Sequence, residues 1–325
     1  MRLPPRTCCC VLLTLQLASA AYAQATVPDR GEGTLSVTYQ HYNVFGHFDA
    51  HGNENTNGGT RSQALVTDLD CGVWNGFGLL MTLPFIASKY TGPPSYFVGR
   101  YLTYPGPLDD GTYHAAFQDL RLELRRGFWA GPVPIAPFVS FSFPTHQYET
   151  VGESVPGRHR RDLQVGASAA VDLERVLPRA YVEGRYAYGA MQRIDHLPFT
   201  RSNIDVEAGV AATSRVLVRG LVGLQIRHKG PSLAQLAATG WVNHDRFIAP
   251  SYLNVGGGPL LSLSRSTEVF ALLVAAVAGS NGAHRQRTLA IGVTFGFGSS
   301  LRGLGGANRS DGRRPDASRV IEQFP

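Results

Sequence analysis

The sequence lacks long apolar runs, and it also lacks blocks of basic residues. After the N-terminus its best apolar run is Val269–Ala278, whereas a membrane-spanning helix needs about 20 such residues. The 30 Lys and Arg residues are interleaved with 24 Asp and Glu residues, for a formal charge of +6. The sequence contains no cluster of Lys and Arg residues of the kind that binds the phosphate backbone of a nucleic acid. The chain is therefore predicted to have no helical anchor and no nucleic-acid partner.

The N-terminus predicts export. Arg2 and Arg6 precede an apolar run, Cys8–Ala21, and Ala21, Tyr22 and Ala23 form an A-x-A site. This order is typical of a cleavable secretory signal peptide. We expect the signal peptide to cover residues 1–23, with cleavage after Ala23.

Cysteine is scarce, with four in the chain, and Cys8, Cys9 and Cys10 lie within the signal peptide. Only Cys71 remains, so the mature chain is predicted to contain no internal disulfide. A lone cysteine of this kind is typically a small apolar filler.

Apolar and polar residues alternate along most of the mature chain. The clearest case is Thr288–Phe297, where every second residue is apolar, namely Leu289, Ile291, Val293, Phe295 and Phe297. A period of two is typical of strands with two different faces. Such segments are expected at 33–44, 61–71, 75–87, 112–125, 134–146, 160–173, 179–191, 201–213, 216–228, 247–263, 267–279 and 287–297.

These segments are longer than the five or six residues typical of soluble strands, and they suit tilted strands that cross a bilayer. Long links are expected at 45–60, 88–111, 147–159, 192–200 and 229–246, alternating with short ones, and only the last link, 280–286, breaks the rule. Outer-membrane barrels show this asymmetry. We predict an all-β fold, a closed antiparallel transmembrane β-barrel of about 12 strands over residues 33–297. A periplasmic lead-in (24–32) precedes it, and a disordered Gly/Arg-rich tail (298–325) follows.

A family resemblance is carried by three short stretches. Gln118–Arg125 (QDLRLELR), Phe141–Thr145 (FSFPT) and Gly157–Leu163 together resemble the outer-membrane family of phenol-degradation meta-pathway channels. That family is distantly similar to long-chain fatty-acid and aromatic-hydrocarbon transporters. His146 departs from the pattern, since it stands where the family usually has glycine. The resemblance implies uptake of small hydrophobic, often aromatic, compounds.

The polar strand faces supply the candidate site. Charges facing lipid would cost about 2–4 kcal/mol at the midplane for Arg, so these side chains are expected inside the barrel. They could form a charged ladder that selects solutes, or a salt-bridge network that fills and blocks a narrow lumen. The predicted lumen-lining residues are Asp119, Arg121, Glu123, Arg125, Asp162, Gln164, Glu183, Arg185, Asp205, Glu207, Arg219 and Arg227.

Other chemistry has weaker support. An enzyme would need a nucleophile and a base, but no spacing links Ser154 and Ser232 to the loop histidines His146, His159, His228 and His244. His47, Asp49 and His51 lie two apart in a flexible loop, which favours adventitious metal binding over a built site. We therefore expect no catalytic residue, metal or cofactor.

The sequence thus predicts a channel in the bacterial outer membrane for passive uptake of small compounds. Its expected partners are membrane lipid, a solute, and the insertion machinery that reads the last strand near Phe297. Two alternatives stay open, namely an outer-membrane lipid or ester hydrolase, and a structural or adhesive surface protein with a closed lumen.

Overall fold

The structure of the protein is a computed structural model. It describes residues 25–56, 58–93, 96–98, 102–104, 106–194, 196–232, 234–236 and 244–298. The predicted signal peptide (1–23) and all of the predicted tail except Gly298 lie outside the described residues.

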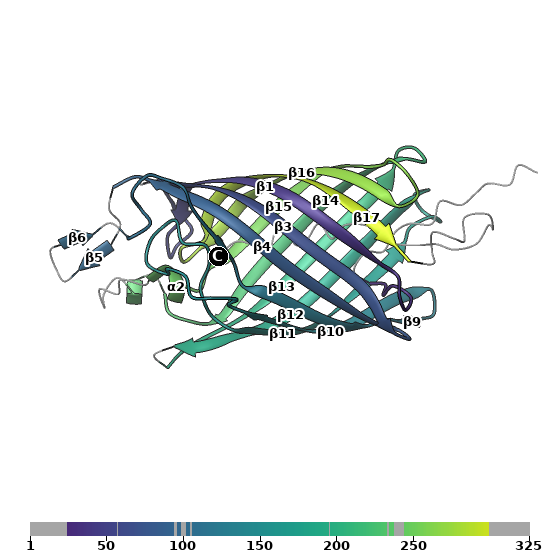
Figure 1. The fold of residues 1–325 in the computed structure, drawn as a ribbon, viewed down its shortest axis with the longest axis horizontal. Helices are drawn as coiled ribbons and strands as arrows, with labels where there is room; N and C mark the ends of the chain where they lie inside the picture. The colour runs from purple at the N-terminus through teal and green to yellow at the C-terminus, as the bar shows by residue number, and fades with distance from the viewer. Residues whose placement is uncertain are drawn as a thin grey trace, which may run out of the picture.

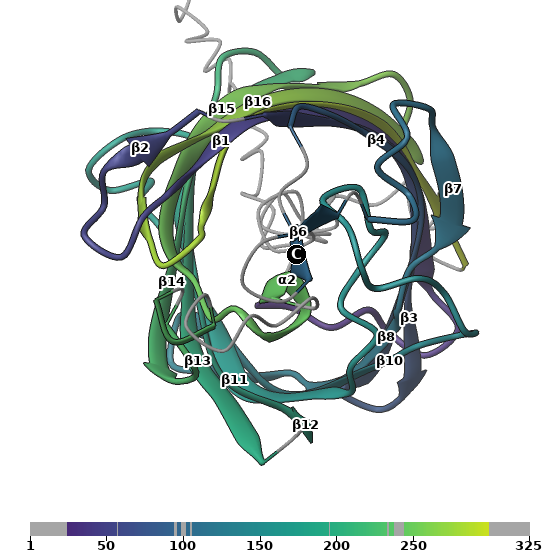
Figure 2. The same cartoon turned by 90° about the vertical axis from the view of Figure 1, so that its left-hand side faces the viewer.

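The described residues form a barrel of twelve main strands, each antiparallel to its neighbours (Figure 1). The last strand pairs with the first, from Gly33 opposite Phe297 to His47 opposite His284, so the sheet closes into the ring seen in Figure 2. This confirms the predicted closed all-β barrel. The main strands are β1 (Gly33–Phe48), β3 (Gly59–Trp74), β4 (Phe77–Thr91), β8 (Leu120–Arg126), β10 (Val133–Phe143), β11 (Asp162–Asp172), β12 (Ala180–Ile194), β13 (Leu197–Ala211), β14 (Val216–Lys229), β15 (Ser251–Ser262), β16 (Thr267–Ser280) and β17 (His284–Phe297).

Short strands and one short helix lie in the links between the main strands, at the two ends of the barrel. They are β2 (Glu54–Asn55), β5 (Tyr96–Val98), β6 (Leu102–Tyr104), β7 (His114–Phe117), β9 (Phe128–Ala130) and the helix α2 (His244–Phe247). Across the described ranges, no helix is long and apolar enough to span a membrane.

One predicted strand is broken. The sequence predicts a single strand over 112–125, but the structure divides it into β7 and β8. Phe117 lies opposite Phe85 and Arg121 opposite Thr82, so three residues of one strand face two of the other, which is a β-bulge. Pro84 lies in β4 at this point and has no N–H to donate, while its carbonyl accepts from the Gln118 N–H at 2.9 Å.

The loop asymmetry holds in part. We define the turn end as the end with the links 75–76, 127–132, 173–179, 212–215 and 263–266, and the loop end as the other. The expected long loop at 192–200 is wrong, because β12 runs to Ile194 and β13 begins at Leu197. Gln192 and Arg193 are exposed in β12, and polar side chains cost nothing in a strand that extends into water.

The two faces of the sheet differ as an outer-membrane barrel requires. Outward-facing residues are apolar and exposed, as with Leu124, Ile291 and Phe295. Cys71 lies half-buried on the same face, with its thiol 3.7 Å from the Leu79 carbonyl oxygen. Inward-facing residues of the same strands are buried and largely polar, as with Gln40 and Glu123. The outer surface therefore suits lipid, and the interior suits hydrogen bonds.

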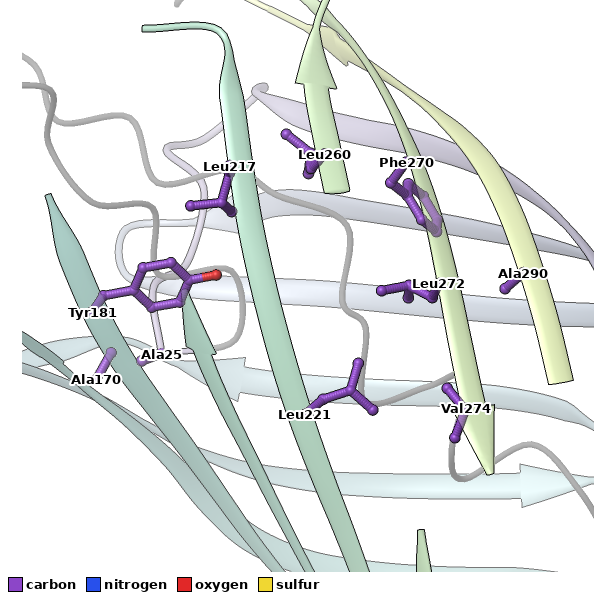
Figure 3. Packing of buried hydrophobic residues seen from close by; sticks show 10 residues of the cluster. All are labelled: Ala25, Ala170, Tyr181, Leu217, Leu221, Leu260, Phe270, Leu272, Val274 and Ala290. Atoms are coloured by element: carbon purple, nitrogen blue, oxygen red, sulfur yellow. The ribbon is translucent and has the colours of Figure 1, made fainter. Parts of the chain in front are cut away.

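The interior also contains an apolar cluster. Figure 3 shows its side chains projecting from strands of the barrel wall, with Ala25 among them. According to the strand register, most of these side chains lie towards the turn end of the barrel. The cluster comprises Ala25, Ala170, Tyr181, Leu217, Leu221, Leu260, Phe270, Leu272, Val274 and Ala290.

Candidate functional site

One charged network in the lumen is centred on Glu123, which is fully buried on β8. Its Oε2 accepts from Arg185 of β12 at 2.8 Å and from Arg121 at 3.1 Å. The Arg185 guanidinium also stacks 3.6 Å from the Phe138 ring centroid. These contacts join β8 to β12 over the inner face of β10 and β11, and they fix the two arginines in position.

Arg125, two residues after Glu123 on the same strand, pairs with Asp70 of β3. Its Nη2 lies 2.5 Å from Asp70 of β3, and its exposure is 2%. Charge-assisted hydrogen bonds of this kind are the strong ones.

A second group lies towards the loop end. Arg201 of β13 donates to both oxygens of Asp162 of β11, at 3.0 and 2.7 Å, a bidentate geometry that suits a guanidinium and a carboxylate. Gln164 donates to the same carboxylate at 2.9 Å. The negative charge of Asp162 is thereby balanced by Arg201, and its oxygens accept hydrogen bonds from within the protein.

A third group lies closer to the turn end. Arg219 of β14 lies 3.5 Å from Glu207 of β13, and the Tyr181 hydroxyl donates to the same carboxylate. Arg219 also lies over the Phe270 ring, 5.2 Å from its centroid. This group connects the charged interior to the apolar cluster.

The remaining predicted residues lie at other points of the lumen wall and the loop end. Asp119 lies in the bulge and accepts from the Tyr148 hydroxyl at 2.6 Å. Glu183 is buried on β12, and Asp205 is buried on β13. Arg227 donates to the Pro231 carbonyl oxygen at 3.4 Å near the loop end.

Several partners of the predicted set are absent from the sequence prediction. Asp70 shares its strand face with Ala64 and Val66, so the face reads as partly apolar. Arg201 lies within a predicted strand and in phase with Asp205, and this phase is the signal that could have identified it. Arg160 lies just before β11 but within the predicted strand 160–173, in phase with Asp162 and Gln164, and this phase is the signal that could have identified it.

The lumen holds a cavity of about 170 Å³ towards the loop end. Gln118, Asp119 and Arg121 line it from the bulge side, and Asp162 and Arg201 line it from β11 and β13. Aromatic side chains also reach it, namely Phe199 and Tyr252.

Segment 25–32 lies within the barrel at the turn end. The Ala25 N–H donates to Glu183 Oε1 at 2.8 Å, and Ala25 is 1% exposed. The Gly31 N–H donates to the Gly72 carbonyl at 3.0 Å, and the Gly72 N–H donates to Glu32 at 2.9 Å. A purple stretch of chain crosses the ring in Figure 2. The residues that precede β1 thus narrow this end of the lumen.

At the loop end of the barrel, loop segments fold over the cavity. Arg158 donates to the Ile248 carbonyl oxygen at 2.7 Å, and Arg246 donates to the carbonyls of Arg158 and His159 at 3.1 Å. Burial, reinforced by Arg158 and Arg246, lowers the pKa of Arg160 to about 9. Burial and the Asp119 carboxylate raise the pKa of Tyr148 well above its ordinary value. These shifts reflect a closely packed, partly dehydrated mouth.

The residues considered for catalysis or metal binding do not converge. Ser154 Oγ lies 2.8 Å from both the Leu108 carbonyl oxygen and Asp109 Oδ1, to one of which it donates, while His228 contacts Ser202 and Tyr188. Asp49 accepts from the backbone of His51 and Asn53. Within the described residues, no group of three or more metal-ligating side chains occurs.

Comparison with known proteins supports the fold. Neither a family model nor a curated protein matches the sequence. The COG4313 outer membrane channel from Pseudomonas putida F1 matches 84% of this chain and 98% of its own, at 12% identity and a TM-score of 0.63. The CymD monoaromatic hydrocarbon channel matches 83% of this chain and 89% of its own, at 10% identity and a TM-score of 0.41. The translocator domain of the autotransporter NalP from Neisseria meningitidis matches 82% of this chain and 88% of its own, at 13% identity and a TM-score of 0.46. The likeness to the COG4313 channel supports an outer-membrane β-barrel fold for this chain.

Proposed function

We propose that this protein is a bacterial outer-membrane channel through which small solutes pass passively. The observation that carries the proposal is a closed twelve-stranded barrel with an apolar outer face and a polar cavity of about 170 Å³ in its lumen. A lipid-facing barrel leaves no sheet edge unpaired, and a polar interior offers a route for solutes. The fold likeness to an outer-membrane channel supports the same function.

The twelve predicted polar residues line or shape this route in the proposal. Arg185, Glu123 and Arg121 form a fixed charged belt at its centre, and the Asp162–Arg201 pair lies at the cavity. Fixed charges at close quarters select solutes by charge and size. The proposed orientation places the turn end and segment 25–32 in the periplasm and the loop end outside the cell, with Phe297 at the strand end that the insertion machinery reads.

The sequence resemblance extends the proposal to small hydrophobic or aromatic compounds as solutes. Phe199 and Tyr252 give the cavity aromatic surface that suits such a ring.

A closed surface protein is the second candidate, because segment 25–32 narrows one end and the Glu123–Arg185 ion pair projects into the lumen between β8 and β12. Single-channel recording in planar bilayers separates the two functions. We expect discrete conductance steps from the purified protein. No conductance, together with unchanged solute uptake by a deletion strain, would refute the channel and favour the closed barrel.

A further inference from the structure

The cavity in the lumen is lined by an unusual number of carboxamide side chains. Five of them come from five different strands and are each at least nine-tenths buried, and a sixth, Gln118, comes from the bulge. The five buried carboxamides are Gln164 of β11, Asn203 of β13, Gln225 of β14, Asn254 of β15 and Gln286 of β17. Since the five strands are distributed along the barrel wall, the carboxamides face the cavity from several sides.

Four of these carboxamides have an amide oxygen without a hydrogen-bond donor in the part of the chain that the structure describes. They are Gln164 Oε1, Asn203 Oδ1, Asn254 Oδ1 and Gln286 Oε1. Buried polar atoms in folded proteins are nearly always hydrogen-bonded to protein, water or ligand. Because all four belong to residues that line one cavity, their donors are expected to come from whatever fills that cavity.

The charged groups around the cavity differ, because the protein already engages them. Arg201 and Asp162 form a bidentate pair, and Tyr148 donates to Asp119. Arg158 donates to the carbonyl of Ile248. The acceptor capacity that the cavity leaves open is therefore concentrated on neutral amide oxygens.

The chemistry of these oxygens restricts the occupant. An amide oxygen only accepts hydrogen bonds, so it suits a hydroxyl or N–H group. An anion offers acceptors where donors are needed. A cation would suit amide oxygens, but Arg121, Arg158, Arg160 and Arg201 line the same cavity. A bare hydrocarbon would leave the oxygens unsatisfied.

The volume of the cavity limits the size of the compound that it can bind. An apolar cavity of about 150 Å³ accepts benzene, so about 170 Å³ suits a single six-membered ring with small substituents. Phe199 and Tyr252 line the same space, and each offers an aromatic ring.

We propose that the lumen cavity binds a neutral single-ring compound with two or more hydroxyl groups, which donate hydrogen bonds to Asn203, Asn254 and Gln286. This rests on the proposed channel function and names its substrate class. It differs from the sequence expectation of a hydrophobic solute by requiring the hydroxyl groups.

The test measures binding directly, so that it does not depend on conductance. Benzene-1,3-diol and its dimethyl ether are titrated into the detergent-solubilised full chain by isothermal titration calorimetry, with a detergent blank. The two probes share a ring, and the ether lacks both donors. We expect saturable binding of the diol and at least about tenfold weaker binding of the ether, since sites built around hydroxyl groups discriminate strongly against analogues that lack them.

Matched variants test the assigned residues. Asn203→Leu, alone and combined with Asn254→Leu, removes the amide at similar size and should abolish the preference for the diol. Gln40→Met is the control, because Gln40 is a buried lumen residue that does not line the cavity. Heat-modifiable migration in gels verifies folding, and the single variant serves where the double variant fails to fold.

Equal affinity for diol and ether, no binding of the diol, or tighter binding of benzoate would each overturn the inference. Loss of channel function is separate, because it is read from single-channel conductance of the unliganded protein. A conducting channel without diol binding refutes only the substrate class, and a diol-binding barrel without conductance refutes only the channel.

Discussion

Replacing Glu123 by glutamine removes one negative charge from the centre of the lumen with almost no change of size. Glu123 is fully buried, and its carboxylate lies 2.8 Å from Arg185 and 3.1 Å from Arg121. The substitution leaves two guanidinium groups without this counter-charge in a confined space. Breaking a buried pair from one side costs about 3–5 kcal/mol, and we expect E123Q to lower the free energy of unfolding by about this amount.

The assay is urea unfolding of the protein in lipid vesicles, followed by tryptophan fluorescence. Trp74 and Trp129 lie exposed at the turn end and will report loss of the barrel. The matched control is Glu149→Gln, the same chemical change at an exposed loop position, where we expect less than about 0.5 kcal/mol.

A second variant tests the physical reason. Replacing both partners, Glu123→Leu with Arg185→Leu, removes the uncompensated charge of Arg185 together with its partner. Apolar replacement of a buried pair is often neutral or stabilising, so the double variant should be more stable than E123Q. If E123Q unfolds like the wild-type protein, or if the double variant is the less stable of the two, the charged belt does not stabilise the barrel as argued.

Three further substitutions test other parts of the lumen. Gly72→Ala places a Cβ about 2.2 Å from the carbonyl oxygens of Pro28 and Asp29, so it should displace segment 25–32 and raise single-channel conductance. The control is Gly220→Ala, whose Cβ meets nothing closer than 3.9 Å and which should leave the conductance unchanged. Leu221→Ala should cost about 2–5 kcal/mol in urea unfolding because it leaves a cavity in the apolar cluster; Leu273→Ala on the outer face is the control, and equal losses would contradict the assignment. Arg201→Gln removes a positive charge from the cavity and leaves Asp162 unpaired, so reversal potentials in a salt gradient should shift towards cation preference; an anion shift would refute the lumen electrostatics.

The barrel could be predicted from the sequence because its two faces meet different solvents. In β17, Leu289, Ile291 and Val293 point outward, while Thr288 and Ala290 are buried inside. Such alternation fixes both the strand and its facing, since a slip of one residue would exchange every side chain between the two faces. Repeated around the chain, it predicts a closed barrel without any long-range information.

The interruptions could not be predicted in the same way, because they depend on neighbours distant in sequence. The bulge at Gln118 and Asp119 lies opposite Pro84, more than thirty positions earlier, and nothing in 112–125 alone marks it. The partner of Arg125 is Asp70 of β3, which shares its face with Val66 and so lacks a clear polar pattern. Pair formation inside a barrel follows from register, and register is a property of the whole sheet.

The attachment of segment 25–32 bears on how the turn end of the proposed channel could open. Its contacts include hydrogen bonds from the Ala25 N–H to Glu183 and between the Gly31, Glu32 and Gly72 backbones, and Ala25 also belongs to the apolar cluster. A Cβ at Gly78 or Gly127 would meet Val27 at 2.8 and 3.1 Å, so glycine at these two positions leaves room for Val27. We expect this segment to leave its place at a lower free energy than unfolding of the barrel, because it is not one of the strands of the closed sheet. In the proposed channel, displacement of this segment would open the turn end while the strands and the ion pairs of the lumen stay in place.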